Sequence, residues 1–154
     1  MMKNSAARFF CVFAMLLLVV SCASCSGAQD NEGGFGMKEY IYLEVGEETL
    51  KVKLEDNASV RALLGLLQNG PVSMTASNYG GFEKVCRLGR SLPSSDVYME
   101  TEPGDVCLYA SSQIVIFHGS NAWEYTRLGR IEGKTQAELK AALSGSDNVV
   151  VVRL

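Results

Sequence analysis

The feature of this 154-residue sequence that most constrains its fold is a succession of short strand-like runs separated by turn residues. Only two short stretches have the periodicity of a helix. Closely spaced strands with few helices are typical of small antiparallel barrels, because closure of the sheet removes its exposed edges. We therefore expect a mainly β domain, a closed antiparallel β-barrel of about eight strands with two short helices.

Alternation of apolar and polar residues predicts the first two strands. Residues 40–45 and 49–54 both alternate, and a short turn that begins at Gly46 joins them into a hairpin. On the second strand, Leu50 and Val52 are expected to face the core. Further strands are expected over residues 71–76, 82–88, 97–99, 106–110, 113–118, 123–128 and 148–153.

Helical spacing occurs twice. Apolar residues recur at i, i+3, i+4 and i+7 from Val60 to Leu67, and Asp56 or Asn57 can cap the start of that helix. Residues 135–138 read Thr-Gln-Ala-Glu, the pattern of a capping box that opens a second short helix.

The N-terminal segment has the features of a secretory signal. Lys3 and Arg8 precede an apolar stretch over residues 9–20. That stretch is shorter than the roughly 20 apolar residues that a membrane-spanning helix needs. We therefore expect a signal peptide over residues 1–21.

The end of the apolar stretch predicts a lipid anchor. Residues 19–22, Val-Val-Ser-Cys, resemble a bacterial lipobox, in which Cys22 would be acylated. Cys25 offers a second position for the same cleavage. A lipidated chain would be held at the cell envelope, facing the periplasm or the exterior, without spanning the membrane. The alternative is ordinary cleavage near residues 23–28, which would release a soluble secreted protein.

The rest of the chain divides into a tether and one domain. Residues 22–37 are small, polar and glycine-rich, as expected of a flexible tether, and residues 38–154 would form the barrel. The net charge of −3 argues against a nucleic-acid partner bound through neutralised phosphates.

Two of the five cysteines, Cys86 and Cys107, lie in the predicted domain. In an oxidising envelope they could form a disulfide, but we favour two small buried apolar residues. The domain has no Cys-x-x-Cys pair, and the chain holds a single histidine, His118, so no metal and no cofactor is expected. His118 ends a predicted strand and is expected to be a surface or rim residue.

Several segments together resemble the bacterial cyclophilin-like domain family, small barrels often found alone behind a lipoprotein signal. The resemblance covers residues 40–154, and its most specific piece is Tyr-Thr-Arg-Leu-Gly-Arg-Ile at residues 125–131. It implies a closed barrel with one helix at each end, and it implies no known reaction. The other matching segments are residues 54–64, 91–93, 103–109 and 113–117.

Three side chains on one predicted strand form the main candidate ligand site. Trp123, Tyr125 and Arg127 alternate, so they share a face, and in an open groove they would suit a peptide or an anionic small ligand. The alternative is a strand of the barrel wall, whose aromatic residues complete the core while Arg127 pairs with Glu124 or Asp105.

A glycine-rich turn adds two more aromatic candidates. Tyr79 and Phe82 flank Gly80 and Gly81. This loop could be a lid over a ligand pocket or an ordinary solvent loop, and the sequence leaves both open.

Enzymatic activity is the rival to simple binding. True cyclophilins are peptidyl-prolyl isomerases, and residues 112–116 resemble one of their strands. Ile114 and Val115 stand where their aromatic residues pack a proline ring, so Gln113 and Arg127 are the remaining catalytic candidates. The sequence favours an envelope-anchored module that binds a peptide, a small molecule or an envelope protein. The alternative is a weak isomerase acting on exported proteins.

Overall fold

The computed structural model describes residues 37–146 and 148–154. The predicted signal peptide over residues 1–21, the acylation site at Cys22 and the tether up to residue 36 lie outside the described residues. Among the residues described, no helix is long and apolar enough to cross a membrane.

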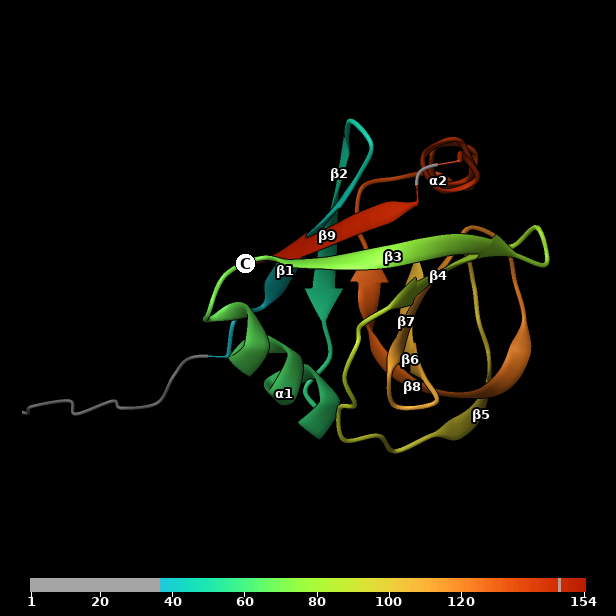
Figure 1. Ribbon diagram of the computed structural model, residues 1–154. Coiled ribbons are helices and arrows are strands. Elements are labelled where there is room, and N and C mark those ends of the chain that lie inside the picture. The colour runs from blue at the N-terminus through green and yellow to red at the C-terminus, as the bar shows by residue number, and fades with distance from the viewer. Residues whose placement is uncertain (1–36, 147) are drawn as a thin grey trace, which may run out of the picture. The chain divides into compact units, whose positions relative to one another are not determined.

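The described residues form nine strands and two helices, and eight of the strands close into an antiparallel barrel (Figure 1). Their order around the barrel is β2-β1-β9-β3-β4-β7-β6-β8, and pairing of β2 with β8 closes the ring. The predicted fold class is therefore confirmed, with β5 as a ninth strand outside the ring on β8. The elements are β1 Tyr40–Val45, β2 Glu48–Leu54, α1 Ala58–Leu67, β3 Val72–Tyr79, β4 Glu83–Arg87, β5 Val97–Glu100, β6 Asp105–Tyr109, β7 Gln113–Phe117, β8 Ala122–Ile131, α2 Gln136–Leu143 and β9 Val149–Arg153.

Two strands extend beyond their predicted ends because tertiary partners lengthen them. β8 continues to Ile131, since β5, β6 and β2 pair with successive parts of it. β3 continues to Tyr79, which pairs with Glu83 of β4. Backbone pairing can therefore carry a strand through residues that have no local apolar alternation.

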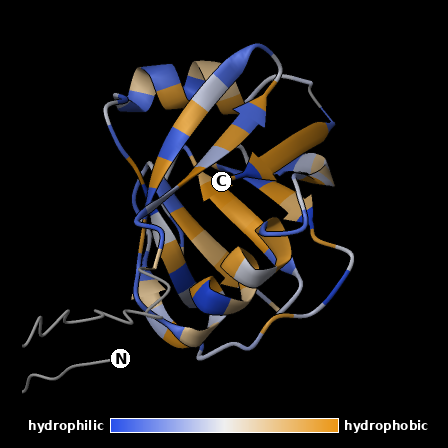
Figure 2. Ribbon diagram, turned by 90° about the vertical axis from the view of Figure 1, so that its left-hand side faces the viewer, coloured by the Kyte–Doolittle hydropathy of each residue, from blue (hydrophilic) through white to orange (hydrophobic). Residues whose placement is uncertain are grey.

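Apolar side chains from the wall fill the interior of the barrel. In Figure 2 the strands carry alternating hydrophobic and hydrophilic bands along their length. The last strand, β9, lies within the wall between β1 and β3, with Val150 and Val152 buried and Val149 exposed. In this uninterrupted run of valines, alternate side chains therefore point toward the core and away from it.

The helices lie at opposite ends of the barrel (Figure 1). Asn57 caps α1 and its side chain accepts a hydrogen bond from the Val60 amide at 3.0 Å. Thr135 and Glu138 form the predicted capping box of α2, whose Leu139 is buried.

Cys86 and Cys107 are both buried and free. Cys86 belongs to the interior core and Cys107 to a smaller apolar cluster on the outer face of the wall, so the two thiols lie on opposite sides of the sheet. Burial raises the pKa of each thiol to about 12. They are two small buried side chains, as the favoured interpretation held, and not a disulfide.

His118 is not at the surface, so that prediction was wrong. Its side chain is 3% exposed. It directly follows β7, whose Ile114 and Ile116 face the interior, and it continues the same alternation. Burial lowers its pKa, and the charges of Lys140 and Lys84 lower it further.

The β2–β8 pairing that closes the barrel, here called the seam, requires glycine at position 129. Gly129 pairs with Leu54, and a β-carbon there would lie 2.2 Å from the Lys53 carbonyl oxygen. The amide of Glu55 also donates to the Leu128 carbonyl at 2.9 Å, so the two backbones are in close contact at this point.

Replacing Gly129 with alanine should therefore destabilise the barrel. We expect Gly129→Ala to lower the free energy of unfolding by about 1–3 kcal/mol, because the seam must open to admit a methyl group. Gly65→Ala is the control: Gly65 lies in α1 with no atom within 4 Å of an added β-carbon, so the change should stabilise by roughly 0.5–1 kcal/mol. Urea unfolding of both variants checks this, and equal stabilities would contradict the role of the seam.

Candidate ligand-binding site

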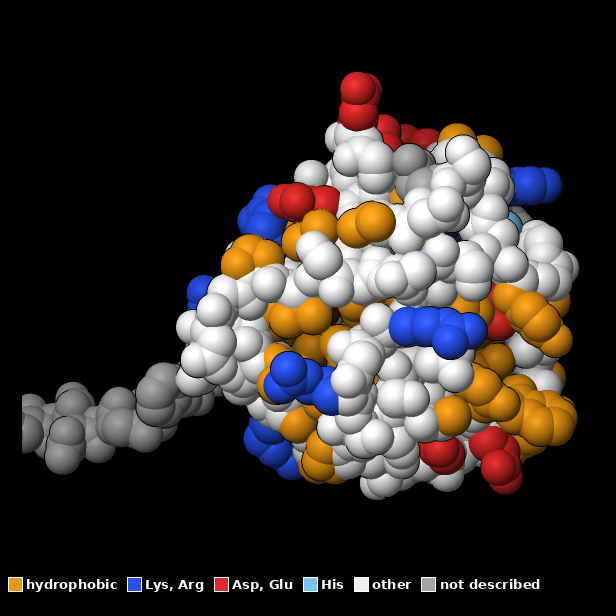
Figure 3. Space-filling view, viewed as in Figure 1, with side chains coloured by type: hydrophobic (Ala, Val, Ile, Leu, Met, Phe, Trp, Pro, Cys, Tyr) orange, Lys and Arg blue, Asp and Glu red, His pale blue; other side chains and the backbone are white. Residues whose placement is uncertain are grey.

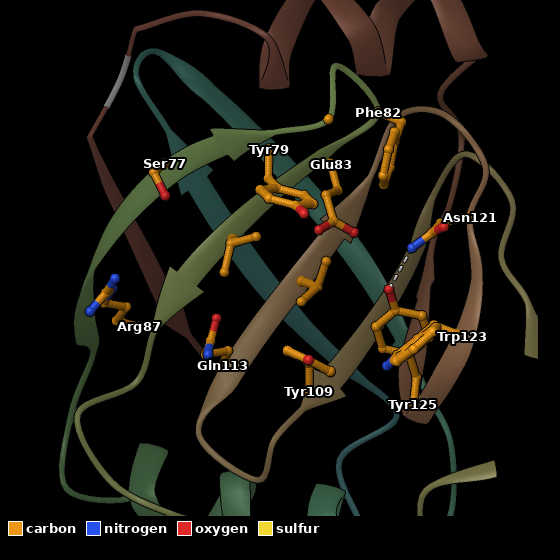
Figure 4. A pocket seen from close by; sticks show the side chains of 13 residues that line it. Ser77, Tyr79, Phe82, Glu83, Arg87, Tyr109, Gln113, Asn121, Trp123 and Tyr125 are labelled. Carbon is orange, nitrogen blue, oxygen red and sulfur yellow. Dashed lines mark hydrogen bonds between the residues drawn. The ribbon is translucent and has the colours of Figure 1, made fainter. Parts of the chain in front are cut away.

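A pocket of about 770 Å³ lies on the outer face of the barrel wall (Figure 4). This volume is within the range of roughly 300–1,000 Å³ typical of small-molecule sites. Val85 of β4 and Val115 of β7 lie opposite each other in the wall and form its apolar floor. The lining residues are Ser77, Tyr79, Gly80, Phe82, Glu83, Val85, Arg87, Tyr109, Gln113, Val115, Asn121, Trp123 and Tyr125.

The fold brings four of the five predicted ligand-binding residues into this one pocket. Tyr79 ends β3 and Phe82 lies in the β3–β4 turn, whereas Trp123 and Tyr125 come from β8, more than 40 residues later. Gln113, one of the two catalytic candidates, also lines the pocket.

Arg127, the fifth residue, does not line the pocket. Its Nη2 atom lies 3.2 Å from Oδ2 of Asp105, and Arg130 Nη1 lies 3.1 Å from the other carboxylate oxygen. The Asp105 side chain is fully buried and also accepts a hydrogen bond from the Glu102 amide at 3.0 Å. A buried carboxylate needs such partners. The alternative in which Arg127 pairs with Asp105 is therefore the one that the structure shows.

The aromatic side chains pack in two groups around the floor. Tyr79 and Phe82 meet edge to face with their ring centroids 6.3 Å apart. Tyr125 contacts Tyr109 at 5.8 Å and Phe117 at 5.4 Å. These are favourable separations for aromatic pairs, so these contacts hold the aromatic side chains of each wall together.

Parts of these walls are open to solvent. Trp123 is 56% exposed and Tyr79 is 65% exposed. Figure 3 shows apolar side chains gathered on the right-hand side of the view, over β8 and β5. Exposed aromatic groups beside a pocket mark a surface suited to binding.

The β3–β4 turn is held against the wall. The Phe82 carbonyl accepts hydrogen bonds from the amides of His118 and Gly119, both at 2.9 Å. Gly80 has a positive φ of 61°, and a β-carbon there would lie 2.2 Å from the Phe82 ring. Only glycine satisfies both constraints. The aromatic loop thus forms one edge of the pocket.

Glu83 is the site residue that the sequence analysis missed. Its side chain points into the pocket beside Tyr79 (Figure 4), although the residue is only 6% exposed. Its Oε2 atom has no hydrogen-bond partner within residues 37–146 and 148–154. Burial raises the pKa of this carboxyl from 4.5 to about 7. The sequence feature that could have identified Glu83 is its position in the two-residue alternation of β4. Glu83, Val85 and Arg87 alternate along the strand and therefore share its outward face.

The two ends of the pocket carry side chains of different type, a basic Arg87 at one end and the Glu83 carboxyl at the other. Arg87 pairs with Gln113 at one end of the β4–β7 ladder, and Glu83 pairs with Phe117 at the other. Four residues along a strand span about 13 Å. The pocket is therefore long enough for an extended ligand with an acceptor at one end and a donor at the other.

Within the described part of the chain, no group of three or more metal-ligating side chains is close enough to hold a metal ion. A second pocket of about 420 Å³ lies between α1 and the ends of the described chain, and it contains none of the predicted site residues.

Comparison with known proteins identifies the fold. The cyclophilin-like family matches this chain over residues 43–154. The solution structure of a hypothetical protein from Archaeoglobus fulgidus is similar, with 21% sequence identity and a TM-score of 0.55 over 79% of this chain and 98% of that chain. At this identity the likeness shows the fold alone. Among curated proteins, none matches the sequence.

The burial of Glu83 predicts a pH-dependent stability. The folded chain keeps this proton up to about pH 7, whereas the unfolded chain releases it near pH 4.5. The folded state therefore binds more protons in that window, and the contribution of Glu83 to stability falls as the pH rises through it. Relative to Glu83→Gln, the free energy of unfolding should fall by about 3 kcal/mol between pH 4.5 and pH 8. Urea unfolding across this range checks the prediction, and parallel pH profiles for the two proteins would contradict it.

Proposed function

This chain belongs to the cyclophilin-like family, and on that premise we propose that it is a binding module that holds an extended peptide segment or a small ligand in the outer-face pocket. The observation that carries the proposal is a set of solvent-exposed aromatic side chains around an apolar floor, Tyr79 and Trp123 above all. Aromatic anchors of this kind dominate the energetics of many interfaces.

The dimensions and polarity of the pocket favour a peptide-like ligand. Its floor extends about 13 Å along β4, the length of four residues of an extended chain. Gln113 and Asn121 add amide groups at its rim, and side-chain amides of this kind can hydrogen-bond a peptide backbone.

The proposed setting is the cell envelope. The lipobox-like sequence at residues 19–22 supports an acylated Cys22 as a membrane anchor. A module tethered in this way would meet exported or envelope proteins at the membrane surface.

Isomerisation of X-Pro bonds is the second candidate function. The observation that favours it is that Gln113, whose side-chain amide can donate a hydrogen bond to a peptide carbonyl, lines the pocket. Arg127 supports it less, because its guanidinium group is paired with the buried Asp105. Binding therefore ranks above catalysis.

A titration with X-Pro peptides, followed by fluorescence and by NMR, distinguishes binding from isomerisation. Trp123 is the only tryptophan of the chain and it lines the pocket, so its fluorescence reports on occupancy. We expect a panel of X-Pro peptides to give a saturable change in this fluorescence, while magnetisation-exchange NMR shows unchanged cis/trans exchange. Faster exchange would make the protein an isomerase. No response in either measurement would overturn the peptide-binding form of the proposal and leave a small molecule as the ligand to test.

Two tyrosine variants test the position of the site. Tyr79→Ala should weaken binding of a responding peptide at least fivefold, because it removes a wall of the pocket, a loss of about 1 kcal/mol or more. Tyr98→Ala is a matched control, since Tyr98 is 73% exposed but does not line the pocket, and its affinity should stay unchanged. Equal effects of the two changes would place the ligand elsewhere.

A further inference from the structure

We propose that the pocket selects ligands that carry an organic ammonium group, with the Glu83 carboxylate as the counter-charge and aromatic rings as the walls around it. The inference rests on the proposed function, because it names the chemical group that the binding pocket recognises. The shared chemistry is a primary or methylated ammonium group, at the end of a lysine side chain or on a free amine.

The first argument is the contrast between two buried carboxylates. Asp105 is fully buried, and the chain supplies it with Arg127, Arg130 and a backbone amide. Glu83 is almost as deeply buried, yet its Oε2 atom has no hydrogen-bond partner among the described residues. An unpaired buried charge costs several kcal/mol, so this carboxyl must either hold a proton or receive a partner from outside.

The second argument is that the basic side chains of β4 lie away from the Glu83 carboxyl. Arg87, the basic residue that lines the pocket, is four residues along β4 from Glu83, about 13 Å away. Lys84 is the next residue of β4, so its side chain leaves the opposite face of the strand, and its Nζ atom donates to the Gly145 carbonyl at 3.2 Å. A cation brought by a ligand would therefore meet Glu83 without competition from either side chain.

The third argument is the aromatic surroundings. Tyr79 and Phe82 form one wall of the pocket, and Trp123 and Tyr125 form another (Figure 4). Aromatic faces attract ammonium groups within about 6 Å of the ring centroid, and the attraction is greater where water is excluded. A carboxylate between such walls favours a cation over an anion or a neutral group of equal size.

The titratable groups around Glu83 come from three neighbouring strands. They are Tyr79 from β3, Cys107 from β6 and Tyr125 from β8, while β7 presents Val115 and Phe117. The Asp105 carboxylate of β6 is held by Arg127 and Arg130, and Tyr109 lies opposite Gln113 at the Arg87 end of the pocket. Burial raises the pKa of Cys107 to about 12 and also raises the pKa of Tyr125, so both stay uncharged at neutral pH. His118 belongs to the opposite face of the wall, near Lys84 and Lys140.

The pKa of Glu83 near 7 then makes cation binding depend on pH. At pH 5.5 the carboxyl is mostly protonated and offers no charge, and at pH 8.5 it is mostly ionised. A ligand with a permanent positive charge isolates this effect, because its own charge does not change over the same range. Its affinity should rise with pH until Glu83 is fully ionised.

The experiment follows Trp123 fluorescence of the full-length chain during titration with choline and with 3,3-dimethyl-1-butanol, its neutral isostere. We expect choline to bind at least tenfold tighter at pH 8.5 than at pH 5.5, and the isostere to show no pH dependence. N-acetyl-lysine amide should show the same rise. The tighter binder of the two cations identifies whether a peptide lysine or a free amine is the preferred source.

Two glutamate variants complete the test. Glu83→Gln keeps the shape of the side chain, and it should lose the pH dependence and bind choline at least tenfold more weakly at pH 8.5. Glu124→Gln is the control, because Glu124 is an exposed residue of β8 outside the pocket lining and the change should behave like the wild type. Circular dichroism of each variant confirms that it is folded.

The outcomes distinguish this inference from the proposed function. Equal binding of choline and its isostere, or a pH dependence that persists in Glu83→Gln, would overturn the selection of ammonium groups. The X-Pro peptides would still change Trp123 fluorescence in that case, and the binding function would stand. If neither cation and none of the peptides changes the fluorescence of Trp123, both the ammonium inference and the proposed binding function are overturned.

Discussion

The pairing of β2 with β8 is the constraint on which the rest of the structure depends. It joins the first hairpin to the longest strand and turns an open sheet into a ring. The contact is possible because Gly129 brings the two backbones closer than any side chain would allow. Closure leaves an interior packed with apolar side chains, and the candidate pocket lies on the outer face of the wall.

A second constraint is that buried carboxylates on that outer face need partners that neutralise their charge. The register between β6 and β8 shifts between Val106 and Cys107. In a regular strand Arg127 and Arg130 would point to opposite faces, and the irregularity lets both reach Asp105. This carboxylate is thus part of the scaffold. Oε2 of Glu83, which lines the pocket, has no such partner among the described residues, so this carboxyl is stabilised by a proton or by a partner from a ligand.

Much of the fold could be predicted from local patterns in the sequence. Alternation predicted the hairpin with Leu50 and Val52 toward the core, and helical spacing predicted α1 with a cap at Asp56 or Asn57, of which the structure shows Asn57. The ends of β3 and β8 were predicted too short, because their last residues are extended by pairing with strands distant in the sequence. His118 was misplaced because a lone polar residue at a strand end gives no local sign of being buried.

The sequence by itself determined the strands and helices, the mainly β class and four aromatic residues of the candidate site, since these depend on side-chain type and on short-range periodicity. Only the tertiary structure decided that Arg127 belongs to the scaffold and that Glu83 belongs to the pocket. The physical reason is the same for both residues. Whether a charged side chain is paired, exposed or buried depends on neighbours contributed by distant strands, and a one-dimensional pattern does not contain them.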